Sequence, residues 1–405
     1  MRVINIFPST KSYFDVVELL YCIDQKVDES IIISRDDHPV PSHVTRTRYI
    51  LSPPGLRGLR FWWWAAKEAK QVIRSSESPE DWVVIDQTVG ITVFILRYLL
   101  WMRCPTIVFF VFPVLNFFFR SGWNDDPWAR PLRPRQRLAY FLDWVKRTVV
   151  EAVGVFSADL IAANSPEILD SNGRFKPSAP RMLLPNSVRP ICPDPRNSRS
   201  NENRLNVIFV AAVQPHKGVG SALEIFSRFS QLFDGARLTI VGGAFPYDKA
   251  WFDTLLSVYQ RKCRNPIEYK GKIPFQELRG VYAEADVFLF PTFCEGSPRV
   301  VQEALQYGCV VATTDIPGNR VIDPDAEVLQ FFPVKDVDRA VSILLKLASD
   351  DAERRRLSVK GQQLMAQNFS PEIVGNIFFE MCSRIHSNPG PSRNVAANIH
   401  ERGCV

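Results

Sequence analysis

The chain has 405 residues, is 46% hydrophobic and carries a formal net charge of +6 at pH 7. This length suggests two domains, and the apolar content is sufficient for two sizeable cores. Eight scattered cysteines without a CxxC pair exclude a disulfide framework and favour a reducing compartment. The modest charge and the lack of a recognised nucleic-acid motif make nucleic acid a poor fit as a partner.

The first expected strand, VINIF, is followed by PSTK rather than by a glycine-rich loop. Backbone approach to a phosphate is therefore less favoured here, although the side chains of Ser9, Thr10 and Lys11 could contact an acceptor. A plain surface turn is the simpler account of these three residues. MRVINIFPSTK has only a brief apolar run, so we expect no secretory signal and a cytoplasmic location.

Two segments combine basic and aromatic side chains at helical spacing, namely RFWWWAAKEAKQVIR, Arg60–Arg74, and RPLRPRQRLAYFLDWVKR, Arg130–Arg147. This combination favours anionic lipid headgroups. The alternative is a helix that packs on its own domain and turns a solvated basic face outward. We expect peripheral contact with the cytoplasmic face of a membrane through these segments.

The most apolar region, residues 89–119, is interrupted by Arg97, Arg103 and Pro105. These interruptions predict a helix, a turn and a buried strand rather than a transmembrane helix. Just before this region, the expected strand WVVID ends in Asp86, a carboxylate that could face an acceptor.

The second half of the chain begins with a strand, a loop and a helix in NVIFVAAVQPHKGVGSALEIFSRF, residues 206–229. The strand RLTIVGG, which contains Gly242, comes next, and a further strand ends at Gly271, shortly before Ile273. Lys217 lies in the first of these loops, at a helix start. A surface lysine there is mildly unfavourable because of the helix dipole, which favours a functional role.

The stretch CEGSPRVVQEALQYGC, residues 294–309, places Glu295 and Glu303 eight positions apart between two buried strands, ADVFLFP and CVVATT. Ser297 is a suitable N-cap, Pro298 suits the first helical position and Gly308 suits the C-terminal cap, which predicts a helix over residues 298–307. Amides from Gly296 to Val300 could hold a phosphate, and a carboxylate could bind a ribose diol. Alternatively, Arg299 and Glu303 are simply a solvated surface pair.

The flanking sequence, with Gly308 and TTDIPGN, Thr313–Asn319, resembles the E-x7-E signature of retaining GT-B glycosyltransferases, with family 4 as the best match. The resemblance covers residues 80–385 and is strongest after Asn206. It implies that Lys217 grips the donor diphosphate and that Glu295 contacts the sugar. It also implies that Glu303 binds ribose and that Ile273 neighbours the base. We expect the remaining donor contacts from Gly242, Gly296, Ser297, Pro298, Arg299 and Val300.

Two departures from the family pattern concern residues that it places near the donor. The arginine that many members carry five residues before the loop lysine is replaced by Ala212, so one phosphate clamp is missing unless Arg299 compensates. The strand PTIVFFVFP, Pro105–Pro113, ends in apolar residues and has no catalytic-site histidine near it.

The resemblance implies an α/β chain with two Rossmann-like domains facing across a cleft and a C-terminal helix that crosses back to the first domain. We expect an acceptor domain over residues 1–188, a linker over 189–204 and a nucleotide-sugar domain over 205–370. A crossover helix is expected over 371–387 and a disordered tail over 388–405.

We therefore expect a retaining hexosyltransferase that moves a sugar from a nucleotide sugar to a glycan, glycolipid or lipid-linked acceptor in polysaccharide or cell-envelope biosynthesis. No metal or cofactor is expected. One alternative is a GT-B nucleotide-sugar epimerase, for which Asp86 is the only visible candidate base. The other is a catalytically lapsed GT-B protein that binds a partner, as the loss at Ala212 would allow. A NAD-dependent enzyme is less favoured, because neither half of the chain opens with a GxGxxG motif.

Overall fold

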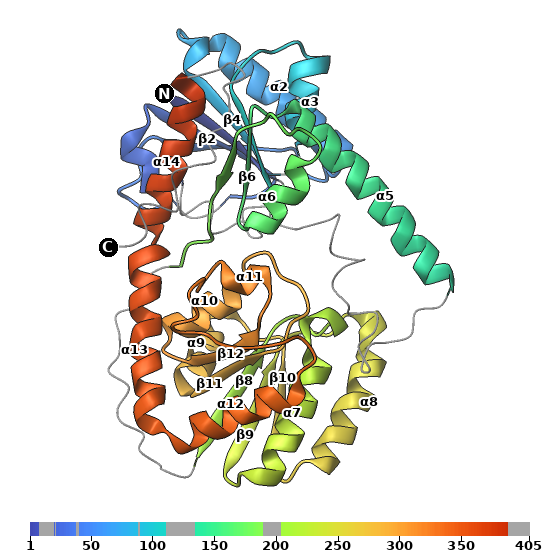
Figure 1. Cartoon of the computed structure of the whole chain (residues 1–405). Helices are drawn as coiled ribbons and strands as arrows, with labels where there is room; N and C mark the ends of the chain where they lie inside the picture. Colours follow the sequence, from blue (N-terminus) through green and yellow to red (C-terminus); the bar gives the residue numbers. More distant parts are fainter. Residues whose placement is uncertain are drawn as a thin grey trace. The chain divides into compact units, whose positions relative to one another are not determined.

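The computed structural model describes residues 1–7, 20, 22–37, 40–87, 90–110, 134–188 and 204–387. The chain divides into two compact units, and each contains a parallel sheet (Figure 1). The predicted tail and all of the predicted linker except Arg204 lie outside the described residues, as do Ser9, Thr10 and Lys11.

The first unit takes in the described residues up to 110, residues 137–187 and the last helix of the chain. Its sheet has seven parallel strands in the order β3-β2-β1-β4-β5-β6-β7. These strands are β1 (Arg2–Ile6), β2 (Glu29–Ser34), β3 (Thr47–Leu51), β4 (Trp82–Asp86), β5 (Thr106–Phe110), β6 (Leu160–Ala163) and β7 (Arg181–Leu183). The predicted strands VINIF and WVVID are β1 and β4.

Helices cover both faces of this sheet, because alternate side chains of its parallel strands point to opposite sides. On β1, Ile4 and Ile6 join one apolar cluster, whereas Val3 joins the other. The helical elements are η1 (Asp24–Lys26), α2 (Leu59–Ser75), η2 (Pro79–Asp81), α3 (Ile91–Phe94), the π-helical turn η3 (Ile95–Leu99), α5 (Pro134–Ser157), α6 (Pro166–Gly173) and α14 (Pro371–Ser387). Helices α2, α3 and α6 contribute to the first cluster and α14 to the second.

The second unit takes in residues 134–136, 188 and 204–370 of the described chain. Its six strands are also all parallel, in the order β10-β9-β8-β11-β12-β13. They are β8 (Leu205–Val210), β9 (Ala236–Val241), β10 (Ile267–Gly271), β11 (Val287–Phe290), β12 (Val310–Thr314) and β13 (Gln330–Phe332). The strands expected on either side of the two glutamates are β11 and β12.

The helical elements of the second unit connect these strands and pack against them. They are η5 (Pro215–Lys217), α7 (Val219–Leu232), α8 (Pro246–Lys262), α9 (Phe275–Glu284), α10 (Arg299–Gln306), α11 (Pro317–Arg320), α12 (Val337–Ser349) and α13 (Asp351–Asn368). The helix expected within residues 206–229 is α7, whose side chains Val219, Ala222, Ile225, Phe226 and Phe229 recur at helical spacing and are buried.

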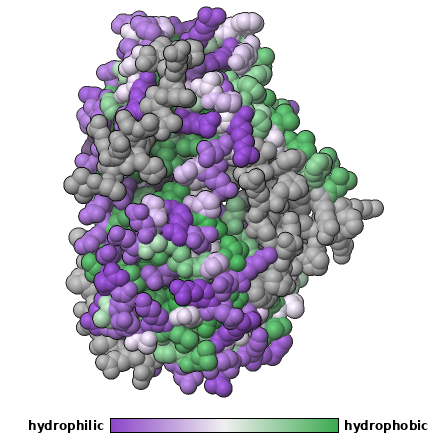
Figure 2. Space-filling view, in the orientation of Figure 1, coloured by the Kyte–Doolittle hydropathy of each residue, from purple (hydrophilic) through white to green (hydrophobic). Residues whose placement is uncertain are grey.

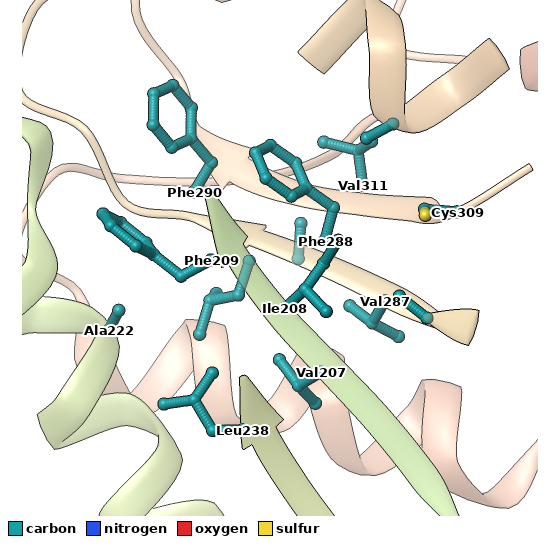
Figure 3. Close-up of a cluster of buried hydrophobic side chains, with 14 of the residues drawn as sticks. Val207, Ile208, Phe209, Ala222, Leu238, Val287, Phe288, Phe290, Cys309 and Val311 are labelled. Carbon is teal, nitrogen blue, oxygen red and sulfur yellow. The ribbon is translucent and has the colours of Figure 1, made fainter. Parts of the chain in front are cut away.

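The central strands β8 and β11 carry the apolar core of the second unit (Figure 3). The rings of Phe209 and Phe290 lie 6.2 Å apart, and those of Phe288 and Phe290 are stacked at 5.5 Å. Complete burial of one such side chain contributes about 1.5–3 kcal/mol. This packing fixes the strand ends from which the candidate site is built.

The two Rossmann-like units confirm the predicted GT-B class, together with the return of α14 to the first unit, where it packs on β4. Within the described part of the chain, no helix combines the length and the apolarity needed to cross a membrane.

Candidate functional site

The candidate site lies where the strand order of the second sheet reverses. The chain runs from β8 outward through β9 and β10, and then returns to the other side of β8 to form β11, β12 and β13. Ligands of open α/β sheets bind at this switch point, beyond the carboxyl ends of the strands. The loops after β8 and β11 carry Lys217 and Glu295.

Lys217 and Glu295 form an ion pair across this switch point, with 2.6 Å between Nζ and Oε1. The Glu295 side chain is 9% exposed and that of Lys217 is 21% exposed. The hydroxyl of Thr292 donates to the same Oε1 atom at 3.2 Å. Two oppositely charged groups are thus held in a partly desolvated site, where electrostatic interactions are stronger than in water.

Close backbone contact brings the two loops together. Gly218 has a φ of 76°, and a Cβ atom there would lie 1.9 Å from the carbonyl oxygen of Pro291. The His216 carbonyl accepts a hydrogen bond from the amide of Phe293 at 3.0 Å, and it lies 3.2 Å from the Thr292 hydroxyl, whose one proton is shared between this oxygen and Glu295 Oε1. Only glycine combines this φ with such an approach, so the Lys-Gly pair has a structural reason as well as a chemical one.

His216 is a second titratable group in the loop that carries Lys217. Burial, with a smaller contribution from the neighbouring Lys217 charge, lowers the pKa of His216 to about 3. The imidazole is therefore neutral at neutral pH and adds no cation to the site.

Glu303 lies on α10 and is 9% exposed, so it is not half of a solvated surface pair. The buried hydroxyl of Tyr282 donates to its Oε2 atom at 3.1 Å, and Arg299 Nε lies 3.8 Å from Oε1. Burial raises the pKa of Glu303, and the Arg299 charge and the Tyr282 hydroxyl only partly offset this effect. The carboxylate is thus held on one side and can still accept further hydrogen bonds on the other.

Helix α10 begins one residue later than the sequence suggested. Its N-cap is Pro298, with φ −74° and ψ 113°, and no side chain caps the first turn, so the prediction of Ser297 as N-cap was wrong. At the other end Gly308 has a φ of 75°, and the amides of Gly308 and Cys309 donate to Leu305 and Ala304. This is the predicted left-handed glycine cap, in the form of a Schellman motif.

The segment Thr313–Asn319 supports the loop that carries Glu295. A Cβ atom on Gly318 would lie 2.2 Å from the Glu295 carbonyl oxygen and 2.9 Å from that of Gly296. The side-chain amide of Asn319 donates to Thr313 Oγ1 and to the Thr314 carbonyl, both at 2.8 Å. Together these contacts hold the Glu295–Gly296 backbone against α11.

Gly242 and Ile273, predicted as donor contacts, follow β9 and β10 at the same edge of the sheet. A Cβ atom on Gly242 would lie 1.7 Å from the Ala211 carbonyl oxygen, and its amide donates to Gly271 at 2.8 Å. Ile273 is half-buried and packs on the core of the second unit. Their loops therefore adjoin the loop that carries Lys217.

Asp86 and Ala212 are two further positions that the sequence singled out. Asp86 is fully buried, and its Oδ2 accepts the amides of Thr92 at 2.9 Å and Val93 at 3.2 Å. This geometry gives the carboxylate a capping role at the start of α3. Ala212 is exposed in the loop between β8 and η5, where it contributes no charge.

Three contributors to the site were missed in the sequence, namely Thr292, Tyr282 and His216. Thr292 follows a predicted strand, and a hydroxyl side chain at that position could have been recognised as a candidate site residue. Tyr282 is 1% exposed and stacks on Tyr307 with centroids 5.6 Å apart. Its spacing on α9 matches a core residue, so the pattern alone did not mark its hydroxyl.

Among the residues that the structure describes, no three His, Cys, Asp or Glu side chains form a group able to hold a metal ion. The charges gathered at the switch point are those of Lys217, Glu295, Arg299 and Glu303. This arrangement can bind an anion through the lysine and hydroxyl groups through the carboxylates.

Residues 193–364 match the family model described as glycosyl transferases group 1. The match spans the switch-point loops and supports a glycosyltransferase of the GT-B fold. A stretch of 167 residues is 24% identical to O-antigen chain mannosyltransferase B of Escherichia coli, and it covers 41% of this chain and 42% of that protein. The matched stretch is thus less than half of the length of that curated relative.

Solved structures of two other proteins share the fold over almost the whole chain. Sucrose-phosphate synthase from Thermosynechococcus elongatus is 15% identical with a TM-score of 0.72, covering 96% of this chain and 99% of the other. Anabaena Alr3699/HepE in complex with UDP and glucose is 14% identical with a TM-score of 0.67, covering 95% and 100%. At these identities the similarity shows the fold alone.

Proposed function

We propose that this protein is a retaining GT-B glycosyltransferase of the family 4 type, which transfers a hexose from a nucleotide sugar to a glycan or lipid-linked acceptor. The observation that carries the proposal is the Lys217–Glu295 ion pair at the switch point of a sheet whose residues match a glycosyltransferase family model. The O-antigen mannosyltransferase relative supports a hexose donor and a role in polysaccharide biosynthesis.

Lys217 is the proposed partner of the donor diphosphate. Negative charge grows on the leaving diphosphate as the bond to the sugar breaks, and a fixed ammonium group stabilises that charge more in the transition state than in the ground state. The contact with Glu295 at 2.6 Å holds the ammonium group in place before the donor arrives. Because Glu295 is nearly buried, its charged carboxylate carries a desolvation penalty in free energy. The ion pair with Lys217 offsets part of this penalty.

The two glutamates of the E-x7-E signature have different proposed roles. Glu295, in the loop beside Lys217, would orient the sugar through its hydroxyl groups. Glu303 would accept hydrogen bonds from the ribose diol, since Tyr282 occupies only one of its two oxygens among the described residues. The amides from Gly296 to Val300 would complete the phosphate site, with Arg299 as an additional cation in place of the arginine absent at Ala212.

No nucleophile or general base is assigned to this chain. Retention of anomeric configuration would follow a front-face route, in which the leaving phosphate oxygen accepts the proton of the acceptor hydroxyl while the new bond forms. Asp86 would have to be the base of the epimerase alternative, and its two hydrogen bonds to the amides that begin α3 favour a structural role instead. The transferase is therefore the preferred function.

The direct test is to incubate the protein with UDP-, GDP- and ADP-sugars and to measure release of nucleoside diphosphate and of sugar. We expect one base and one sugar to support release, with the new anomeric centre retaining the donor configuration in an NMR time course. Conversion of the nucleotide sugar into its epimer, without release of diphosphate, would instead establish the epimerase.

A further inference from the structure

An apolar cavity in the first unit is far in sequence from the loops of the candidate site. It lies between α2, the segment α3–η3 and α5, and has a volume of about 730 Å³. This volume is within the range of small-molecule sites. Nearly all of its lining is hydrocarbon, supplied by residues that include Leu59, Trp63, Phe94, Leu99, Val149 and Val153.

Positive charge borders this apolar cavity. Arg60 and Lys67 contribute to its lining, and both are exposed. Neither forms an ion pair with any of the residues that the structure describes. Helix α2 as a whole carries four cationic side chains and one carboxylate. The cavity thus presents hydrocarbon inside and uncompensated cations at its edge, which is complementary to an anionic group joined to an apolar chain.

Exposed apolar side chains extend the cavity along α5. The exposed large apolar side chains described on this helix are Leu138, Phe141, Leu142, Val145, Val149 and Phe156, and apart from Phe141 they follow one another at intervals of three, four or seven residues. In Figure 2, hydrophobic residues gather at the right-hand margin, where α5 lies in Figure 1. An exposed apolar stripe of this length on a monomer is typical of an interaction surface.

The segment after η3 adds an aromatic residue at the same edge. Trp101 is 84% exposed and has a φ of 54°, which is unusual for a residue with a Cβ atom. The ammonium group of Lys70 donates to the Leu100 carbonyl at 2.8 Å and so ties this segment to α2. On the helix itself, Lys67 Nζ lies 5.7 Å from the centre of the exposed Trp63 ring. Exposed tryptophans beside lysines are characteristic of surfaces that lie at the boundary between water and lipid.

We propose that the face formed by α2, residues 95–101 and α5 binds an anionic lipid bilayer, and that hydrocarbon from one lipid enters the cavity. The lipid phosphates lie against Arg60 and Lys67, while Trp63 and Trp101 reach the headgroup level. The exposed apolar side chains of α5 also leave water when the face binds the bilayer. Binding therefore requires both the charged side chains and the apolar surface. This inference does not depend on the proposed chemistry at Lys217 and Glu295.

The test is flotation of the purified protein with vesicles of phosphatidylcholine alone and with vesicles containing equimolar phosphatidylglycerol. We expect the protein to float with the anionic vesicles and to remain free with the neutral ones. The double variant Arg60→Gln/Lys67→Gln should bind the anionic vesicles about thirtyfold more weakly, because two cations are removed from the lipid surface. The double variant Trp63→Ser/Leu99→Ser should also bind more weakly although its charge is unchanged.

A matched control separates this face from general attraction of a basic protein. Arg261→Gln/Arg264→Gln removes the same charge from exposed positions of the second unit and should bind nearly as the wild type does. Equal binding by the two charge variants would overturn the proposal. Both charge variants should keep the wild-type melting temperature, since the replaced cations are exposed.

Hydrogen exchange identifies the occupant of the face. Anionic vesicles should protect the amides of α2 and of residues 95–101 and leave those of α7 unchanged. If raising the protein concentration without vesicles gives the same protection, the face is an interface between two copies of the chain and the lipid proposal is wrong. Intact nucleotide binding in the same samples would show that such a failure concerns this face alone.

Discussion

Lys217 Nζ lies 2.6 Å from Glu295 Oε1, although the two residues are 78 positions apart in the sequence. The parallel pairing of β8 with β11 brings them together, because it places the carboxyl ends of both strands at one edge of the sheet. The close approach of Gly218 to Pro291 then sets the distance between the two loops. A cation and a carboxylate are thereby fixed at the point where this class of sheet binds ligands.

Removal of the Lys217 charge should impair turnover more than binding. Lys217→Met is expected to lower kcat about a hundredfold to a thousandfold, because the leaving diphosphate loses a fixed cation in the transition state. Lys262→Met is a matched control, since Lys262 also pairs with a glutamate, Glu224, at 3.3 Å. The assignment fails if both variants release nucleoside diphosphate at the wild-type rate.

Tyr282 is expected to position Glu303 for the donor. Tyr282→Phe removes the hydrogen bond to Glu303 and should raise KM for the nucleotide sugar about tenfold, with a smaller effect on kcat. Tyr259→Phe is the control, because it removes a similar bond from a buried tyrosine to Glu224, 2.8 Å in length. If the two variants change KM equally, the hydroxyl of Tyr282 has no specific part in binding.

Gly218 should be sensitive to a single added methyl group. A Cβ atom in Gly218→Ala would meet the Pro291 carbonyl at 1.9 Å on a backbone with φ 76°, so we expect a loss of more than about 2 kcal/mol in the free energy of unfolding. Gly271→Ala has φ 65° but open space around the new atom and should cost only about 1 to 2 kcal/mol. Equal losses in denaturant titrations would show that the close approach to Pro291 is unimportant.

The raised pKa of Glu303 predicts a dependence of stability on pH. The folded chain holds this proton more tightly than the unfolded chain, whose reference pKa is 4.5. The contribution of Glu303 to stability is therefore complete below pH 4.5 and is lost as the pH rises through the folded-state pKa. Glu303→Gln cannot titrate, so its melting temperature relative to wild type should increase over that interval. A difference that does not change with pH would exclude this ionisation.

The strand, loop and helix around the two glutamates could be predicted because each element has a strong local signal. The apolar runs that became β11 and β12 are buried on both faces, and Gly308 ends α10 with a left-handed residue. The start of α10 was displaced by one residue because Pro298 itself adopts an extended ψ of 113° and takes the cap position. Local rules could not separate Ser297 from Pro298 as the cap.

The contacts between distant segments could not be predicted in the same way. The pairing of Lys217 with Glu295 depends on strand order, and Tyr282 has the spacing of an ordinary core residue on α9. Asp86 looked like a candidate base or acceptor contact at a strand end, whereas its carboxylate accepts the amides that begin α3. In each case the local sequence is compatible with two roles for the side chain. Only its contacts in the folded protein distinguish between these roles.

The most direct measurement is a calorimetric titration of the wild type and of Glu303→Ala with UDP, GDP and ADP. The account predicts that one of the three binds the wild type, and that its affinity falls at least about tenfold in Glu303→Ala while the melting curve stays cooperative. Failure of all three to bind the wild type, or binding of equal strength to the variant, would contradict a nucleotide-sugar site at the switch point.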